Sequence, residues 1–336
     1  MDIKTALAKI GARIDLTGEE MRDVMNIIMS GEATPAQTGA FLLGMRIKGE
    51  TVGEIAAAVS ILREKMVKVD VPDGAIDIVG TGGDGGHTYN ISTAASLVVA
   101  STGIPVAKHG NRALSSKSGS AECLQALGVN IDLKPEQISR CVREAGIGFM
   151  FAPSHHPAMK HVGPARQELG TRTMFNLLGP QANPAGVKHY MLGVYDRRWA
   201  EPVAAALLAN RATDVWVVSG SDGLDEVTTT GPTFVASVRD GNLTSFEITP
   251  EEAGLSRAQP ADLKGGDPAH NAAALVALLE GAKTPYRDIV LMNAAAAFIV
   301  ARRVGKLREG VELAAEAIDS GRARETLRRL VEISNA

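Results

Sequence analysis

Residues 76–102 read IDIVGTGGDGGHTYNISTAASLVVAST, and this stretch decides the fold. Its first four residues predict a short strand. Five of the next seven residues are glycine, in the order Gly80-Thr81-Gly82-Gly83-Asp84-Gly85-Gly86. Residues 92–102 then predict a helix. A strand, a glycine-rich turn and a helix in this order are typical of the repeating unit of an α/β sheet.

The glycine-rich loop, residues 80–86, has the composition of an anion site. Without side chains in the way, its backbone amides and the N-terminus of the next helix can approach a negative group. Some of its glycines are expected at positive φ. No lysine follows the glycines as the P-loop pattern G-x-x-x-x-G-K-[ST] requires, which argues against a nucleoside triphosphate. A flexible loop without a ligand is the alternative.

Two polar segments follow the glycine-rich loop. The first, residues 90–93, stands near the start of the expected helix, where a hydroxyl can cap the helix, bind phosphate or ligate a metal. The second, residues 108–120, carries three cations and four hydroxyls behind a predicted strand at 104–107. Ligands of open α/β sheets gather at the carboxyl ends of strands, so we expect these segments at one site. An ordinary solvated loop is the alternative for residues 108–120.

Charged groups farther along the chain complete the candidate site. Asp225 and Glu226 are adjacent, and such pairs are usually solvated, but Mg²⁺ on a diphosphate is typically held by one or two carboxylates. Residues 153–166 contain three histidines whose spacing fits no zinc pattern. Arg166 ends this segment, and its guanidinium can pair with the carboxylate of an acidic aromatic substrate.

The rest of the chain predicts two kinds of architecture. The first seventy residues predict helices with capping boxes that begin at Thr17, Thr34 and Thr51. A turn cluster at 71–74 marks a boundary, and strands then alternate with helices through residue 219. This order predicts an α/β fold: a small all-helical N-terminal domain plus a large α/β domain whose central, mainly parallel sheet is covered by helices.

The segment 176–184 interrupts the alternation of strands and helices. It holds two prolines and a glycine in nine residues, which we interpret as excluding a regular helix or a central strand. The interpretation is a hinge or a crossing between domains.

Composition narrows the class of protein. The charged residues, 35 Lys+Arg against 38 Asp+Glu, give a net charge of -3, without the basic excess of a nucleic-acid binder. The N-terminus has no apolar signal region, and the longest apolar run, 289–301, is broken by Asn293 and falls short of the ~20 residues of a membrane span. Two cysteines, Cys123 and Cys141, fit reduced core thiols. We expect a cytoplasmic protein that contacts neither nucleic acid nor membrane.

Taken together, the motifs resemble those of the anthranilate phosphoribosyltransferase family, in order and spacing, over essentially the whole chain. The segments that carry the resemblance are Gly80-Thr81-Gly82-Gly83-Asp84, Asn90-Ile91-Ser92-Thr93, residues 108–116, His156-Pro157-Ala158-Met159, Arg166, Asn176-Leu177-Leu178-Gly179-Pro180 and Asp225-Glu226. One departure is Gln181, where the family pattern leads us to expect a more apolar residue.

The resemblance implies an enzyme of the second step from chorismate in L-tryptophan biosynthesis. The phosphoribosyl group of 5-phospho-α-D-ribose 1-diphosphate would pass to the amine of anthranilate, giving N-(5-phosphoribosyl)anthranilate and diphosphate, with Mg²⁺ as cofactor. It also implies a homodimer of the nucleoside phosphorylase/phosphoribosyltransferase class, with anthranilate synthase as separate partner chains. The small domain would be residues 1–71 completed by 165–185, and the large catalytic domain residues 72–164 and 186–336.

The resemblance also implies roles for individual residues. The expected contacts to phosphoribosyl diphosphate are Gly80, Gly83, Asp84, Thr88, Asn90, Ile91, Ser92, Thr93, Lys108, His109, Gly110, Asn111, Arg112, Ala113, Leu114, Ser115, Ser116 and Ser120. The expected contacts to anthranilate are Gly80, Asn111, Arg166, His109 and His156. The expected Mg²⁺ ligands are Ser92, Asp225 and Glu226. No residue is identified as a general base.

Two other functions stay open from the sequence. A pyrimidine nucleoside phosphorylase shares the expected architecture, but it binds free phosphate and needs no paired carboxylates for Mg²⁺. A non-catalytic protein that binds a phosphorylated sugar is the other alternative, and the intact set of Ser92, Asp225 and Glu226 argues against it.

Overall fold

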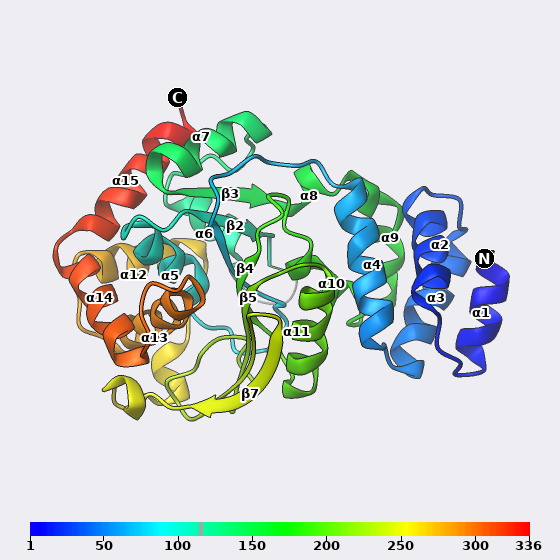
Figure 1. Cartoon of the computed structure of the whole chain (residues 1–336). Helices are drawn as coiled ribbons and strands as arrows, with labels where there is room; N and C mark the ends of the chain where they lie inside the picture. Colours follow the sequence, from blue (N-terminus) through cyan, green and yellow to red (C-terminus); the bar gives the residue numbers. More distant parts are fainter. Residues whose placement is uncertain (114–116) are drawn as a thin grey trace.

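The N-terminal part of the chain is a group of four helices, as predicted. The computed structural model describes residues 1–113 and 117–336. The four helices are α1 (Ile3–Gly11), α2 (Gly18–Met29), α3 (Pro35–Lys48) and α4 (Val52–Lys65), which lie at one end of the molecule in Figure 1. The three predicted capping boxes are confirmed, because Thr17, Thr34 and Thr51 each accept from the third helical amide while the third side chain returns to the cap.

The larger part of the chain contains one sheet of seven strands. They are β1 (Ile76–Gly80), β2 (Val106–Gly110), β3 (Ile147–Phe151), β4 (His189–Gly193), β5 (Asp214–Gly220), β6 (Thr233–Arg239) and β7 (Asn242–Ile248). Their order is β3-β2-β1-β4-β5-β6-β7. The first five strands in this order pair in parallel, and β6 and β7 pair antiparallel at one edge. The prediction of a mainly parallel sheet is confirmed.

Helices lie on both sides of this sheet (Figure 1). They are α5 (Ile91–Ala100), α6 (Ser120–Ala126), α7 (Pro135–Ala145), α8 (Ala152–His155), α9 (Gly163–Leu169), α10 (Phe175–Gln181), α11 (Ala200–Ala209), α12 (Pro268–Leu279), α13 (Pro285–Val300), α14 (Leu307–Asp319) and α15 (Arg322–Ser334). Helices α5 and α13 pack on each other and on the central strands, while α11 packs on β5 and β6 and reaches α4.

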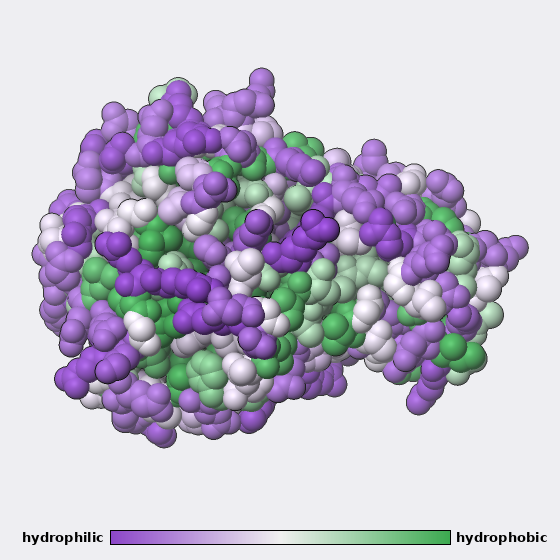
Figure 2. All heavy atoms as spheres, in the orientation of Figure 1, coloured by the Kyte–Doolittle hydropathy of each residue, from purple (hydrophilic) through white to green (hydrophobic). Residues whose placement is uncertain are grey.

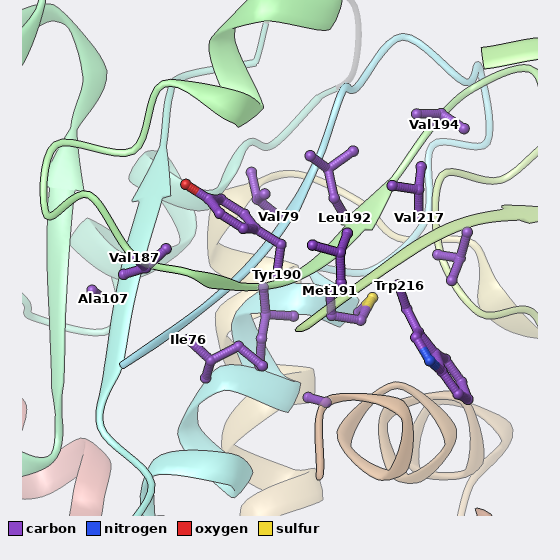
Figure 3. Close-up of a cluster of buried hydrophobic side chains, with 14 of the residues drawn as sticks. Ile76, Val79, Ala107, Val187, Tyr190, Met191, Leu192, Val194, Trp216 and Val217 are labelled. Carbon is purple, nitrogen blue, oxygen red and sulfur yellow. The ribbon is translucent and has the colours of Figure 1, made fainter. Parts of the chain in front are cut away.

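The core of the sheet is aliphatic, as the low aromatic content requires. Figure 3 shows side chains of β1, β4 and β5 that interdigitate there, among them Ile76, Met191, Leu192 and Val217. All four are at most 1% exposed, and burying such a side chain contributes about 1.5–3 kcal/mol. This packing holds the carboxyl ends of β1 and β4 in a fixed relation to each other.

Strands β1 and β4 form the point where the strand order reverses. From β1 the chain moves outward to β2 and β3, then returns across β1 to β4 and moves outward in the other direction. The two strands end in register, with Gly80 opposite Gly193. Because ligands of open α/β sheets bind in the crevice outside the carboxyl ends of the strands at such a reversal, the topology leads us to expect a site near the ends of β1 and β4.

The segment 176–184 is partly helical, so the interpretation that excluded a regular helix was wrong. Helix α10 includes Pro180 near its end. The helix is only seven residues long, so Pro180 removes a single bond of the helical ladder. The Gln181 side chain donates to the Leu177 carbonyl at 2.8 Å and supports the same turn.

One arginine ties α4 to the larger part of the chain. The Arg63 guanidinium donates to the Gln181 carbonyl, to the Asn210 carbonyl and to the Tyr190 hydroxyl. Helix α9 packs on α3, and α10 packs on α4. The domain division at residues 71, 164 and 185 stays a prediction.

Two expectations from the composition concern the helices and the cysteines. None of the helices in the described ranges is both long and apolar enough to cross a membrane. Cys123 and Cys141 are free and buried, and burial raises the pKa of their thiols to about 12 and about 11. Both thiols are therefore inert at neutral pH.

Candidate active site

The glycine-rich loop leaves the end of β1 and enters α5 above the sheet. Gly82, Gly83 and Gly85 have φ values of 66°, 73° and 74°, so the prediction of positive φ in this loop is confirmed. A side chain would be strained at these three positions. The loop therefore keeps its backbone exposed in the crevice, where it can face a ligand.

The first turn of α5 carries a hydrogen-bonding group that the protein leaves unused. Its N-cap is Asn90, whose side chain makes no capping hydrogen bond to the helix. The Thr93 hydroxyl is buried and has no hydrogen-bond partner among the described residues. The Ile91 and Ser92 amides already donate to the Tyr89 carbonyl and to Glu226, so the Thr93 hydroxyl is the group of this turn that a phosphate oxygen would complete.

The Asn90 side chain is used to hold other elements in place. Its Oδ1 accepts from Asn271 Nδ2 at 2.9 Å and from the Ser118 hydroxyl at 3.3 Å. Its backbone carbonyl accepts from the Tyr286 hydroxyl at 3.2 Å. Asn90 thus connects the start of α5 to α12, to α13 and to the loop after β2.

Asp225 and Glu226 lie over the same crevice, brought there by the loop after β5. Asp225 Oδ2 accepts from the Gly82 amide at 2.6 Å, and Glu226 Oε1 accepts from the Ser92 amide at 3.2 Å. Burial, and then the neighbouring Asp84, raises the pKa of Asp225 to about 7. Burial, and then Asp225, raises the pKa of Glu226 well above its ordinary value.

Glycine at the ends of β1 and β4 makes room for this carboxylate pair. A Cβ on Gly193 would stand 1.6 Å from the Asp225 carbonyl oxygen, and one on Gly80 would stand 2.2 Å from Asp225 Oδ2. Neither approach is sterically allowed. The two glycines therefore let the loop with Asp225 settle directly on the strand ends.

The oxygen atoms gathered here fit a magnesium ion. Carboxylates of Asp225 and Glu226 stand beside the Ser92 residue, and hard oxygen donors of this kind are those that Mg²⁺ prefers. Burial raises the pKa of both carboxyl groups, so a bound cation would favour their ionised forms. In the described part of the chain no three His, Cys, Asp or Glu side chains form a complete metal cage. The ion would therefore need substrate oxygens as well.

Lys108 is a buried cation beneath this site. Its Nζ donates to the Ile78 carbonyl at 2.6 Å and to the Ser92 hydroxyl at 3.3 Å. Burial lowers the pKa of Lys108, while the carboxylates of Asp77, Glu226 and Asp225 oppose that shift. The ammonium group thus sits where it can neutralise part of a bound anion.

The loop after β2 is described at both its ends. Ser120 donates to the Asn111 carbonyl at 3.3 Å, which closes the loop, and the Arg112 guanidinium lies 5.5 Å from the centre of the Phe151 ring. The predicted contacts Leu114, Ser115 and Ser116 lie outside the described residues.

A cavity of about 300 Å³ opens beside the glycine-rich loop. Its wall combines the end of that loop, the loop after β2 and a turn before α12. The lining residues are His87, Thr88, Lys117, Ser118, Lys264, Gly265 and Gly266. Two ammonium groups and two hydroxyls give the cavity the character of a phosphate site.

Known proteins match this chain over its full length. The family model described as the glycosyl transferase family a/b domain matches residues 72–324, and the model described as the glycosyl transferase family helical bundle domain matches residues 4–66. Anthranilate phosphoribosyltransferases from Bradyrhizobium sp. (strain BTAi1) and Rhizobium meliloti (strain 1021) are each 58% identical over 335 residues, which cover 100% of this chain and 99% of each relative.

The chain belongs to the anthranilate phosphoribosyltransferase family.

Solved structures agree with this membership. The Thermus thermophilus anthranilate phosphoribosyltransferase superposes with a TM-score of 0.94 at 44% identity, covering 100% of both chains. The Saccharomyces cerevisiae enzyme in complex with phosphoribosyl diphosphate and Mg superposes with a TM-score of 0.92 at 28% identity, covering 99% of this chain and 98% of that one.

The family resemblance also indicated residues for an acceptor, which come from the end of β1, from β2 and the loop after it, and from the segment 153–166. Arg166 stands on α9 with its guanidinium 5.6 Å from the Phe175 ring centre, and no described carboxylate lies within 4.0 Å of it. Burial lowers the pKa of Arg166. The free guanidinium is therefore available to a bound carboxylate.

His109 of β2 packs against His156, which belongs to the same segment, 153–166, as Arg166. Their ring centres are 5.1 Å apart, and the Nε2 atom of each has no partner among the described residues. Burial lowers the pKa of His109 well below its ordinary value and lowers that of His156 to about 4. Both rings are neutral at pH 7, so they present ring faces and unpaired nitrogens rather than positive charge.

A buried hydrogen-bond network holds the backbone of His109 in place. The Asp77 carboxylate accepts from the His109 amide at 3.1 Å and from Asn183 Nδ2 at 2.7 Å. Asn183 also donates to the Ala107 carbonyl at 2.8 Å. The end of the segment 176–184 is thus fastened to β1 and β2, close to the two histidines.

Sequence reasoning missed several residues that shape the site of this family member. Arg172 donates to the Gly83 carbonyl and lies 4.1 Å from the Tyr195 ring centre, so it holds the glycine-rich loop from the side of α9. Lys264 donates to the Gly86 carbonyl at 2.6 Å. Gly193 faces Asp225. Of these three residues, only Gly193 had a signal in the sequence, its place in a predicted strand. Arg172 and Lys264 resembled ordinary surface cations.

Proposed function

We propose that this protein transfers the phosphoribosyl group of 5-phospho-α-D-ribose 1-diphosphate to the amine of anthranilate, releasing diphosphate. The observation that carries the proposal is the meeting, above β1 and β4, of the first turn of α5, whose buried Thr93 hydroxyl has no described partner, with the two buried carboxylates of Asp225 and Glu226. A helix N-terminus suits phosphate, and paired carboxylates suit the divalent cation that accompanies a diphosphate. A phosphate site alone would not need two carboxylates, and a cation site alone would not need a helix N-terminus.

Ser92, Asp225 and Glu226 would hold Mg²⁺ in this proposal. When bound, Mg²⁺ would neutralise charge on the leaving diphosphate. The yeast relative was solved in complex with phosphoribosyl diphosphate and Mg, which supports the same pairing here. Three protein residues would not complete the octahedral coordination of Mg²⁺, so diphosphate oxygens and water would fill its remaining coordination positions.

The residues around the crevice would stabilise the leaving group. Charge grows on the diphosphate as its bond to the anomeric carbon breaks, with an oxocarbenium-like sugar in the transition state. Lys108 and the buried Thr93 hydroxyl are in place before the reaction, so they would need little reorganisation when that charge appears. This arrangement favours departure of diphosphate over its mere binding.

The acceptor residues would act by placement. Arg166 would pair with the anthranilate carboxylate, while Asn111, His109 and His156 would line its binding site. Placement of two reactants can remove up to about 7–11 kcal/mol of a barrier. We assign no general base, because burial lowers the pKa of both histidines, which makes them weak bases, and the anthranilate amine is itself a neutral nucleophile.

A direct assay tests the proposal. Anthranilate fluorescence is expected to decay when protein, Mg²⁺ and phosphoribosyl diphosphate are all present, and to stay constant when any one is left out. Phosphorolysis of uridine is expected to be absent. Uridine phosphorolysis without loss of anthranilate would instead identify a nucleoside phosphorylase, and binding of phosphoribosyl diphosphate without turnover would identify a binding protein.

Replacing Arg166 by Ala is expected to raise the KM for anthranilate by about tenfold or more, since a charged hydrogen bond contributes about 1.5–3 kcal/mol. The KM for phosphoribosyl diphosphate is expected to stay near its original value. Initial rates with each substrate varied in turn measure both constants. Arg198→Ala is the matched control, because Arg198 also lies over an aromatic ring, that of Trp199, but in the turn before α11 and not on α9. An unchanged anthranilate KM would remove Arg166 from this role.

The cavity with Lys117 and Lys264 would take one phosphate group of the sugar substrate. Lys264→Met is expected to raise the KM for phosphoribosyl diphosphate by roughly tenfold, the change that a loss of about 1.4 kcal/mol produces. Lys283→Met, at an exposed lysine paired with Asp319, is the control. Competition by ribose 5-phosphate and by inorganic diphosphate then shows which phosphate is affected. Equal KM values in both variants would exclude the cavity from substrate binding.

The family resemblance also implies a homodimer, and the surface supports that proposal. Five of the eight large apolar side chains that the described residues expose lie among the first 67 residues, namely Ile14, Leu43, Ile47, Val52 and Val67. Figure 2 shows apolar patches among polar atoms on this helical part. Sedimentation at twice the mass of one chain is the expected result, and sedimentation as a single chain would contradict it.

A further inference from the structure

Asn293 is a polar residue within the apolar run 289–301, whose residues 289–300 are buried and form most of α13. All residues of α13 except Pro285 and Asp288 are buried, and Asn293 itself is 0% exposed. In the sequence it breaks the longest apolar run of the chain. A buried amide without partners costs about 1–3 kcal/mol, so its hydrogen bonds indicate what the position is used for.

The Asn293 side chain is bound to both backbone groups of one residue, Val227. Its Oδ1 accepts from the Val227 amide at 2.9 Å, and its Nδ2 donates to the Val227 carbonyl at 2.8 Å. The second hydrogen of Nδ2 goes to the Ile289 carbonyl at 2.8 Å, one turn back in α13. Two bonds to one residue fix both its position and the rotation of its peptide groups.

Val227 directly follows Glu226, so this clamp acts on the carboxylate pair. The amide that Asn293 holds belongs to the peptide group between Glu226 and Val227. Fixing that peptide group limits where the Glu226 side chain can point, and Glu226 Oε1 is then held by the Ser92 amide. Residues that orient metal ligands in this way typically change metal affinity or activity by about 10–100-fold when replaced.

The same helix holds the other half of the site two turns away. Tyr286, seven residues before Asn293, donates its hydroxyl to the Asn90 carbonyl at 3.2 Å. Seven residues span about 10.5 Å and return to nearly the same helix face. Helix α13 also packs along α5, whose first turn carries Ser92. One rigid helix therefore contacts both the start of α5 and residues 221–232, the loop between β5 and β6 that carries Asp225 and Glu226 and is called the carboxylate loop below.

Besides the bonds that Asp225 accepts from Gly82 and Glu226 accepts from Ser92, several hydrogen bonds of the carboxylate loop stay within it or reach only the start of β6. Asp222 Oδ2 accepts from the hydroxyls of Thr228 and Thr230, each at 2.6 Å. The Thr228 amide donates to the Thr233 hydroxyl at 3.0 Å. These bonds give the loop its shape, but they do not set its distance from Ser92. The bonds to Asn293 connect the loop to α13 and, through that helix, to α5.

We propose that Asn293 is a positioning residue that holds Asp225 and Glu226 at their distance from Ser92, with α13 as the spacer. The inference rests on the proposed function, in which these three residues bind the metal that accompanies phosphoribosyl diphosphate. Asn293 touches neither the substrate nor the metal. Its effect passes through the backbone of Val227.

The test measures metal binding without turnover. Mn²⁺ is titrated into protein with phosphoribosyl diphosphate but no anthranilate, and free Mn²⁺ is followed by electron paramagnetic resonance. Asn293→Ala and Asn293→Ser are expected to weaken Mn²⁺ binding by roughly tenfold or more. The kcat is expected to fall with it, while the KM for anthranilate, whose residues lie elsewhere, stays near its original value.

Asn210→Ala is the matched control. Asn210 Nδ2 also donates to a carbonyl one turn back in its own helix, that of Ala206, and to a carbonyl on another helix, that of Ala56. The substitution removes two side-chain hydrogen bonds at the contact between α4 and α11, against three for Asn293. It is expected to lower the thermal midpoint as the Asn293 variants do, and to leave Mn²⁺ binding within twofold.

The possible outcomes distinguish the positioning role of Asn293 from the metal-binding role of Asp225 and Glu226. Asn293 variants that lose thermal stability but bind Mn²⁺ within twofold of the unmodified protein would make Asn293 merely structural. If neither variant folds, Tyr286→Phe, which removes one hydroxyl, decides: weaker Mn²⁺ binding supports the spacer and unchanged binding overturns it. Tight Mn²⁺ binding by a variant with Asp225→Asn and Glu226→Gln would instead overturn the metal ligands themselves.

Discussion

Turnover is expected to fall by about 10³-fold or more when Asp225→Asn and Glu226→Gln are combined, because removing preorganised electrostatic stabilisation commonly costs 10²–10³ per group. The neutral amides cannot balance a divalent cation, so the charge on the leaving diphosphate would lose its main compensation. The protein itself is expected to stay as stable or become more stable. Burial raises the pKa of both carboxyl groups, which means that the fold opposes their ionised forms.

Steady-state rates in Mg²⁺ and the thermal midpoint measure the two halves of this expectation. The control pair is Glu251→Gln with Glu252→Gln, since these adjacent carboxylates lie on the surface, outside the crevice. Normal turnover by the Asp225 and Glu226 double variant would contradict the assignment of these residues as metal ligands. A collapse of the thermal midpoint would contradict the account of their raised pKa values.

Gly193→Ala is expected to reduce turnover by about 100-fold or more, although it adds one methyl group. That methyl would need to occupy a point 1.6 Å from the Asp225 carbonyl oxygen, so the backbone of the carboxylate loop must move. A displacement of about 1 Å at a catalytic group can cost 10²-fold in rate. Unlike the double variant, this one keeps both carboxylates, and higher Mg²⁺ concentrations are therefore expected to restore part of the activity.

Rates measured across a series of Mg²⁺ concentrations check this expectation. Gly53→Ala is the control, because a Cβ there meets no atom within 4 Å. Wild-type turnover by the Gly193 variant would mean that the loop with Asp225 can shift without harm, and the close approach of loop and strand would lose its functional meaning.

Local signals in the sequence predicted most elements correctly because their causes are local. The capping boxes at Thr17, Thr34 and Thr51 are satisfied within four residues, and the pattern of β1, glycine-rich loop and α5 needs no distant partner. The hairpin of β6 and β7 was missed, although its turn, Asp240-Gly241, is a recognised hairpin signal and both residues have positive φ. β7 is exposed along most of its length, so it lacks the apolar alternation that marks a strand.

The failed interpretation of segment 176–184 shows the limit of composition rules. Proline disfavours a helix interior, but α10 ends one residue after Pro180, where few ladder bonds remain to lose. What holds the segment is distant in sequence: Arg63 binds the Gln181 carbonyl, and Asn183 binds Asp77. Neither partner can be recognised from the segment itself.

The sequence by itself determined the chemical groups of this protein: a glycine-rich loop for an anion, hydroxyls at a helix start, and an adjacent pair of carboxylates. These follow from residue type and short spacing, which a linear chain displays directly. Only the tertiary structure decided that Asp225 lies on Gly193, that Asn293 clamps Val227 and that Lys264 closes the glycine-rich loop. Each of these contacts joins residues from separate elements, and the sheet order and helix packing, not local propensity, set their distance.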